Sequence, residues 1–122
     1  MTHIIPINTY QFLEKIYNKK TTPSDWKYLG SHPSVVFFHS PINNFSNSLL
    51  PALEIIAKKG KGKYNVYSVD TTQEEELTTL YMVNYIPTIY LCPMNGNPTI
   101  IEREININKL RKAIDKMLDS TF

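Results

Sequence analysis

The sequence predicts a single α/β domain in which helices cover both faces of a central mixed sheet, in the order β-α-β-α-β-α-β-β-α. Apolar runs typical of strands alternate with segments whose apolar residues follow helical spacing. The run at 35–38 is continuously apolar, which is typical of a central strand covered on both faces. Asn95-Gly96, between the last two predicted strands, is a hairpin signal, so these strands should run antiparallel.

The first elements are a short strand over residues 3–7 and a helix over residues 10–18. Asn8 or Thr9 should cap this helix, because both side chains accept hydrogen bonds from free N–H groups. The apolar face of the helix is formed by Phe12, Leu13, Ile16 and Tyr17. The segment 21–33 is rich in turn residues, yet we expect it to pack against the core because it carries Trp26, Tyr28 and Leu29.

The central strand covers 34–39 and is followed by a helix over residues 46–59. Pro51 lies inside this helix, where it removes one backbone hydrogen bond and bends the axis, and Gly60 and Gly62 end the helix.

The second half of the chain adds a strand at 64–70, a helix at 74–82 and strands at 88–92 and 99–102. Asn108 should cap a final helix, whose apolar face presents Leu110, Ile114, Met117 and Leu118.

At 122 residues and 42% hydrophobic content, the chain is long enough for one core that needs neither a metal nor a disulfide. Its 13 basic and 11 acidic residues give a net charge of +2, a balance too even to indicate nucleic-acid binding. Four lysines lie within residues 58–63. We interpret them as a solvated helix end that opposes the negative end of the helix dipole, in preference to an anion-binding patch.

The sequence predicts no metal and no cofactor. His3 and His32 lack further ligands at metal-site spacing, and a Gly-rich phosphate loop is absent. No apolar run reaches the roughly 18 residues of a membrane helix, and the first residues lack the pattern of a signal peptide. We therefore expect no membrane association and a cytoplasmic location, although an exported chain trimmed of its signal peptide would look the same.

Cys92 is the only cysteine, so the chain cannot form an intramolecular disulfide. The thiol lies in the apolar run 89–92, and we interpret it as a buried structural group rather than a reactive one.

Several motifs together resemble the thioredoxin family over about residues 4–118. They are Trp26-Lys27-Tyr28-Leu29-Gly30 before the central strand, Val69-Asp70-Thr71, Tyr81, the hairpin Pro93-Met94-Asn95-Gly96, and the spacing from Pro51 to Pro87. The resemblance implies the thioredoxin fold for the single domain. It also places Asn43 and Ser46 where the family has its attacking and resolving cysteines, with Asn44 and Phe45 between them.

The same register implies that the groups needed for dithiol chemistry are lost together. Thiol-disulfide exchange requires a thiolate, a resolving thiol and a proton acceptor. Phe37 takes the place of the family's buried acid, and His39 and Ile42 take the places of two tryptophans. The resemblance therefore implies a redox-inactive member. It favours a non-catalytic role and leaves an enzyme of another kind open.

The family proline before the fourth strand has a cis peptide bond, so the resemblance implies a cis Ile86–Pro87 bond. In the family this bend presents backbone groups to an extended peptide. We therefore expect a module that binds a peptide or protein partner, whose identity the sequence leaves open together with the oligomeric state. The candidate binding residues are Ile42, Asn43, Asn44, Phe45, Ser46, Tyr85, Ile86 and Pro87. Two arrangements of Phe45 and Tyr85 stay open: their rings either form an exposed aromatic site, or they cover the loop so that the groove is closed.

Asn43 and Asn44 also have a structural interpretation, since either side chain can cap the helix that follows. Two enzymatic alternatives stay open. The resemblance implies a His39–Asp70 hydrogen bond, which would raise the pKa of His39 by favouring its charged form. With Ser46 this pair would resemble a hydrolase triad. In the second alternative Ser46 would activate glutathione, as serine does at a helix start in other thioredoxin-fold enzymes.

Overall fold

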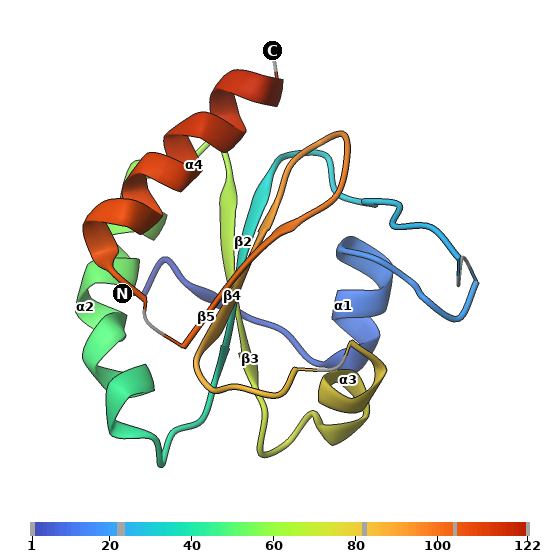
Figure 1. Ribbon diagram of the computed structural model, residues 1–122, viewed down its shortest axis with the longest axis horizontal. Coiled ribbons are helices and arrows are strands. Elements are labelled where there is room, and N and C mark those ends of the chain that lie inside the picture. The colour runs from blue at the N-terminus through green and yellow to red at the C-terminus, as the bar shows by residue number, and fades with distance from the viewer. Residues whose placement is uncertain (1, 22–23, 82, 104, 122) are drawn as a thin grey trace.

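The computed structural model describes residues 2–21, 24–81, 83–103 and 105–121 (Figure 1). Within these ranges the predicted order of strands and helices is confirmed. The elements are β1 (Ile5–Pro6), α1 (Thr9–Lys15), β2 (Ser34–His39), α2 (Asn44–Lys59), β3 (Asn65–Asp70), α3 (Glu75–Leu80), β4 (Thr88–Cys92), β5 (Thr99–Glu102) and α4 (Ile107–Thr121). Met82, where the prediction for the third helix ends, lies outside the described residues.

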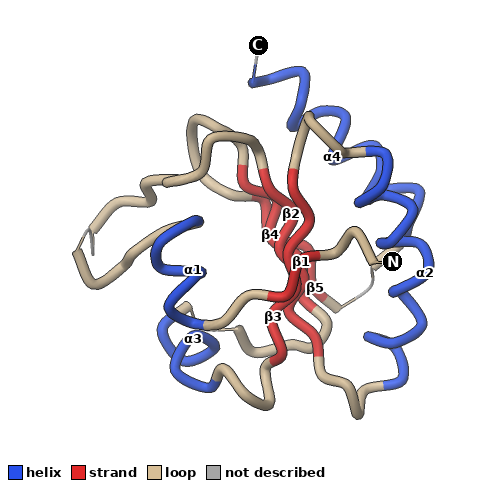
Figure 2. The backbone as a smooth tube through the Cα atoms, turned by 180° about the vertical axis from the view of Figure 1, so that it is seen from behind, coloured by secondary structure: helices blue, strands red, loops and turns tan. Residues whose placement is uncertain are grey.

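The strands form one mixed sheet in the order β1-β3-β2-β4-β5. β1, β3 and β2 are parallel, whereas β4 runs antiparallel to β2, and β5 runs antiparallel to β4 as the Asn95-Gly96 hairpin predicts. Figure 2 shows α1 and α3 on one side of the sheet and α2 and α4 on the other. Helices therefore cover both faces.

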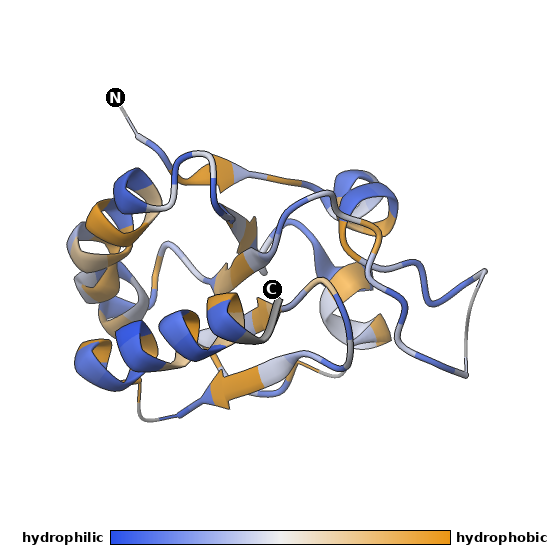
Figure 3. Cartoon of the chain, turned by 90° about the horizontal axis from the view of Figure 1, so that it is seen from above, coloured by the Kyte–Doolittle hydropathy of each residue, from blue (hydrophilic) through white to orange (hydrophobic). Residues whose placement is uncertain are grey.

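Alternation along the central strand divides the core into two halves. Val35 and Phe37 belong to the cluster under α2 and α4, and Val36 and Phe38 belong to the cluster under α1 and α3. All four side chains are fully buried, which explains why β2 is apolar at successive positions. In Figure 3 hydrophobic residues occur at intervals along α2 and α4 among hydrophilic ones, which is the pattern of helices that bury one face.

The start of α1 agrees with one of the two predicted caps. Asn8 accepts the N–H of Gln11, and the Gln11 side chain accepts the N–H of Asn8, so the two residues form a capping box. At α4 the predicted cap is wrong. Asn108 lies inside the helix, and Asn106 accepts the Lys109 N–H at 3.1 Å in its place.

α2 begins two residues earlier than predicted, because Asn43 is the side chain that caps it. Pro51 lies inside the helix at an exposed position. Gly60 is the residue at which the helix ends, and Gly62 follows with a φ of 84° that glycine adopts without strain.

The segment between α1 and β2 packs down only in part as predicted. Trp26 and Tyr28 contact the core under α1 and α3, and the Trp26 ring lies 4.6 Å from the ring of Tyr17. Leu29 is 45% exposed, so its predicted packing is wrong. Its backbone N–H, rather than its side chain, ties this segment to α1 by donating to the Ile16 carbonyl at 2.9 Å.

Candidate functional site

Strand pairing brings the β2–α2 loop beside the segment that enters β4. β2 and β4 are antiparallel and pair Phe38 with Thr88, so the residues that follow Phe38 leave the sheet beside those that precede Thr88. Figure 1 shows both connections at the same end of the sheet. The two groups of predicted site residues, 42–46 and 85–87, therefore lie at one edge of the fold.

The β2–α2 loop is a hydrogen-bonded turn followed by a helix cap. The Asn43 N–H donates to the Ser40 carbonyl at 3.0 Å, and Asn43 Oδ1 accepts the Ser46 N–H at 2.8 Å. The capping role predicted for Asn43 is confirmed. Asn44 is the exposed first residue of α2 rather than its cap. The loop is thus held by its own polar groups, and its apolar side chains do not have to be buried to order it.

Three apolar side chains at this edge, named the proline-loop rim below, are exposed. Ile42 is 86% exposed, Phe45 43% and Tyr85 37%. Neither ring is buried over the loop, so the structure favours the exposed aromatic site over the closed one. Single apolar residues are common on protein surfaces, whereas a group at one edge is typical of an interaction site.

The segment before β4 combines buried side chains with unused backbone groups. The Ile86–Pro87 peptide bond is cis. Pro87 is buried, and Ile86 packs against the core under α1 and α3. Thr88 Oγ1 donates to the Tyr85 carbonyl and holds the turn. No hydrogen bond between described residues uses the N–H or C=O of Ile86, so both groups are available to another molecule.

Arg103, directly after β5, is a residue of this edge that sequence reasoning missed. Its guanidinium carbon lies 4.2 Å from the centre of the Tyr85 ring, and its Nη2 donates to the Tyr85 hydroxyl. Because β4 and β5 pair Thr88 with Glu102, the residue after Glu102 lies next to the proline segment. The hairpin signal could have located it. Arg103 has a φ of 67°, a left-handed conformation that is uncommon for residues other than glycine.

Two positions that the resemblance assigns to the family's dithiol chemistry, those of Phe37 and Ser46, lie in the interior of the fold. Phe37 is fully buried in the core under α2 and α4. Ser46 is also fully buried, and its Oγ has no hydrogen-bond partner. Cys92 is a buried free cysteine as predicted, and burial raises the pKa of its thiol far above the usual range.

The predicted hydrogen bond between His39 and Asp70 is wrong. Asp70 Oδ1 instead accepts the N–H and the Oγ1 hydroxyl of Thr72, at 2.9 and 2.6 Å, because a residue two positions along the chain lies within local reach. His39 stacks on Phe37, with ring centres 5.2 Å apart, and its buried Nδ1 has no partner. Burial lowers the pKa of His39 and outweighs the opposing charge of Asp70, so the predicted rise in pKa is also wrong.

Neither enzymatic alternative is supported by this geometry. A hydrolase triad needs a histidine that is hydrogen-bonded to both the serine and the acid. Within the part of the chain that the structure describes, Ser46 Oγ and His39 Nδ1 both lack hydrogen-bond partners. Since Ser46 is fully buried, its hydroxyl is also not presented to glutathione.

Among the described residues, no three His, Cys, Asp or Glu side chains are arranged to hold a metal ion. None of the described helices combines the length and the apolar character needed to cross a bilayer.

Comparisons with known proteins agree with the fold. The thioredoxin family model matches residues 15–116. A curated thioredoxin from Borreliella burgdorferi strain B31 is 26% identical over 96 residues, which is 79% of this chain and 81% of that protein. The crystal structure of chloroplastic thioredoxin z superposes with a TM-score of 0.75 at 16% identity and covers 93% of each chain. The predicted thioredoxin fold is confirmed, and since the family model spans well over half of its length, the chain belongs to the thioredoxin family.

Proposed function

We propose that this chain is a non-catalytic member of its family that binds an extended segment of a peptide or protein partner at the cis-proline edge. The observation that carries the proposal is the proline-loop rim, a group of exposed apolar side chains beside backbone groups that have no hydrogen-bond partner within the described part of the chain. A partner that covers the rim removes apolar surface from water, which is the main favourable term in most protein association.

The Ile86 backbone supplies the directional part of the interaction. An extended segment alongside residues 85–87 accepts from the Ile86 N–H and donates to its carbonyl, as an added strand does at the edge of a sheet. The Ile86 side chain is anchored in the core, so these backbone groups are already in position before binding. This part of the interaction requires no thiol.

The rim side chains supply the apolar part. Ile42 is 86% exposed in the free chain, and complete burial of such a side chain is worth about 1.5–3 kcal/mol. Phe45 adds an aromatic surface at the start of α2. Arg103 above Tyr85 offers guanidinium N–H groups to carbonyl or carboxylate oxygens. The site therefore suits a segment that carries an apolar side chain and acceptor groups.

The non-catalytic part of the proposal depends on what dithiol exchange requires. The thiolate is the nucleophile, and a second thiol must resolve the mixed disulfide. The chain has one cysteine, and it is buried in β4. Asn43 and Ser46 cannot take the two sulfur roles.

Site-specific photo-crosslinking in the native host tests the binding proposal. A benzophenone side chain at position 45 should capture partners that the same group at position 10 does not, because Tyr10 is also exposed but lies on α1. Ile42→Ala should reduce this capture, whereas the matched change Ile55→Ala, at a 49% exposed residue of α2, should leave it unchanged. Equal capture at both positions, or capture insensitive to Ile42→Ala, would contradict the proposed site.

An insulin-reduction assay tests the non-catalytic part separately. We expect a rate equal to that of the uncatalysed reaction. A rate above it that disappears in Cys92→Ser would refute redox inactivity and would leave the binding surface to be judged by the crosslinking result.

A further inference from the structure

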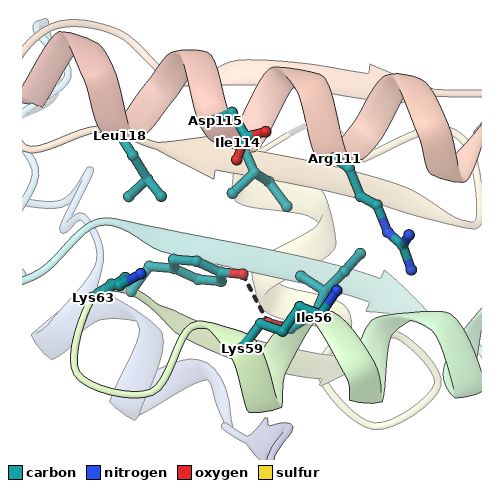
Figure 4. Close-up of a pocket in the computed structure, with 8 residues that line it drawn as sticks. Ile56, Lys59, Lys63, Arg111, Ile114, Asp115 and Leu118 are labelled. Atoms are coloured by element: carbon teal, nitrogen blue, oxygen red, sulfur yellow. Dashed lines mark hydrogen bonds between the residues drawn. The ribbon is translucent and has the colours of Figure 1, made fainter.

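A cleft lies on the opposite side of the sheet from α1 and α3, between the C-terminal part of α2 and the middle of α4 (Figure 4). Its volume is about 290 Å³. Figure 4 shows Arg111, Ile114 and Leu118 extending from α4 toward α2 and toward the segment that carries Lys63. The cleft shares no residue with the proline-loop rim and is independent of the proposed function.

The cleft has an apolar base that is held rigidly. Ile56, Ile114 and Leu118 contribute aliphatic side chains, and Tyr64 contributes its ring. The Tyr64 hydroxyl donates to the Ile56 carbonyl at 2.8 Å. The ring also lies against Gly60, where an added Cβ would come within 2.3 Å of a ring carbon. With both ends fixed, the Tyr64 ring forms a constant wall rather than a mobile lid.

The mouth of the cleft carries an excess of positive charge. Lys59, Lys63 and Arg111 line it, against one carboxylate, Asp115. The charged side-chain groups of these three residues form no ion pair and no hydrogen bond with another residue of the described ranges. Three cations without ion-pair partners around a half-open cleft are a suitable site for an anion, because a ligand there pairs with charges that one carboxylate does not balance.

The helix dipole explains only part of this arrangement. Lys59 is in the last turn of α2, where a cation is favourable next to the free carbonyl groups. Lys63, by contrast, lies beyond the end of that helix, and Arg111 comes from α4. Their convergence with Lys59 on the same cleft is a tertiary feature that the interpretation of residues 58–63 as a solvated helix end does not cover.

We propose that this cleft binds a phosphate monoester whose other end is a small apolar group, such as a single ring or a short alkyl chain. The phosphate dianion meets the cations at the mouth, and Arg111 can donate to two of its oxygens at once. The apolar group lies on Tyr64, Ile114 and Leu118. A volume of about 290 Å³ is near the lower end of the range for ligand pockets, so the ligand is small.

NMR titration of the full chain with phenyl phosphate tests the proposal. Amide shifts should move at Tyr64, Ile114 and Leu118 and leave Tyr85 and Ile86 unchanged. Inorganic phosphate and benzyl alcohol, which carry only one half of the ligand each, should bind at least about tenfold more weakly. Equal binding of benzyl alcohol would refute the role of charge, equal binding of inorganic phosphate would refute the role of the apolar base, and absence of shifts at these residues would refute the site.

Variants of charged surface residues distinguish binding in the cleft from general electrostatic attraction to the protein. Arg111→Gln and Lys63→Gln should each weaken binding of phenyl phosphate about fivefold or more, and Asp115→Asn should strengthen it about twofold. Lys112→Gln removes an exposed charge of α4 that does not line the cleft and should change the affinity little. An equal loss of affinity in Lys112→Gln and Arg111→Gln would show attraction to the whole basic surface and would overturn the proposal.

Discussion

Beneath α1 and α3, six aromatic residues form a packed cluster, whereas at the proline-loop rim residues of the same kinds stand at the surface. The six are the residues whose rings contact one another in this half of the core, namely Phe12, Tyr17, Trp26, Phe38, Tyr81 and Tyr90. Neighbouring ring centres in it lie 4.6–6.4 Å apart, within the range of favourable aromatic contacts. In the rim, Phe45 and Tyr85 are exposed, and Arg103 covers one face of Tyr85.

The polar groups of the two regions also differ: those of the cluster are hydrogen-bonded within the protein, and those of the rim are less so. In the cluster, Tyr81 donates to the Tyr17 carbonyl at 2.6 Å and accepts the Lys19 N–H at 3.1 Å, and burial raises the pKa of Tyr81 to about 12. At the rim, the backbone groups of Ile86 form no hydrogen bond with another described residue. The comparison teaches that aromatic residues of the same kinds can serve packing in one region and stand exposed in another, so aromatic composition alone does not separate the two.

The largest effect should come from truncation inside the cluster. Phe12 is fully buried between Phe38 and Tyr81, so Phe12→Ala should lower the free energy of unfolding by about 3–5 kcal/mol. Ile42→Ala at the rim should change it by no more than about 0.5 kcal/mol. Urea denaturation of both variants measures the difference, and a large loss in Ile42→Ala would mean that the rim serves stability rather than binding.

A smaller effect should follow from removal of a single hydroxyl. Tyr81→Phe deletes the acceptor of the Lys19 N–H and a donor in the cluster, which should lower the free energy of unfolding by about 1–3 kcal/mol. Tyr85→Phe deletes a hydroxyl that contacts only the exposed Arg103 among described residues and should cost less than about 0.5 kcal/mol. Thermal unfolding of the two variants measures both effects. Equal losses of stability would show that the hydroxyl groups of the cluster and of the rim contribute alike, contrary to the comparison.

The smallest effect concerns His39, which is half-buried at the end of β2 and stacks on Phe37. Burial holds the pKa of His39 in the folded chain below its ordinary value of about 6.5, so the unfolded chain binds the proton more readily. Stability is therefore fully present above the unfolded pKa and is lost as the pH falls from about 6.5 through the folded value. Urea midpoints at pH 7.5 and 5.5 should differ less in His39→Gln than in the unaltered chain. The exposed residue His32 provides a control, since His32→Gln should keep the original difference.

Strands were the most predictable part of this chain. The bounds of β2, β4 and β5 agree with the prediction, because each is an apolar or β-rich run limited by proline or by the Asn95-Gly96 turn. Helix ends were less predictable where several polar residues stand close together. Asn106 and Asn108 carry the same side chain, so the sequence does not distinguish them as caps, and in the structure Asn106 accepts the Lys109 N–H.

The candidate site was predictable in its backbone but not in its side-chain partners. The resemblance located both segments of the edge, and exposure of Phe45 and Tyr85 required the structure. The prediction of a His39–Asp70 hydrogen bond was wrong because Thr72, two residues along the chain, binds the Asp70 carboxylate instead. Arg103 was missed because it is far in sequence from residues 85–87 and meets them only through strand pairing.

Arg103, which covers one face of Tyr85, has a left-handed backbone conformation that is energetically unfavourable for it. Such a conformation costs a side-chain-bearing residue roughly 1–2 kcal/mol, whereas glycine adopts it freely. Arg103→Gly would therefore relieve the turn and uncover the ring in one step. A substitution that stabilises the fold at this position would therefore also expose more apolar surface at the edge and remove one positive charge. The φ angle of residue 103 thus couples the stability of the fold to the chemical character of this surface.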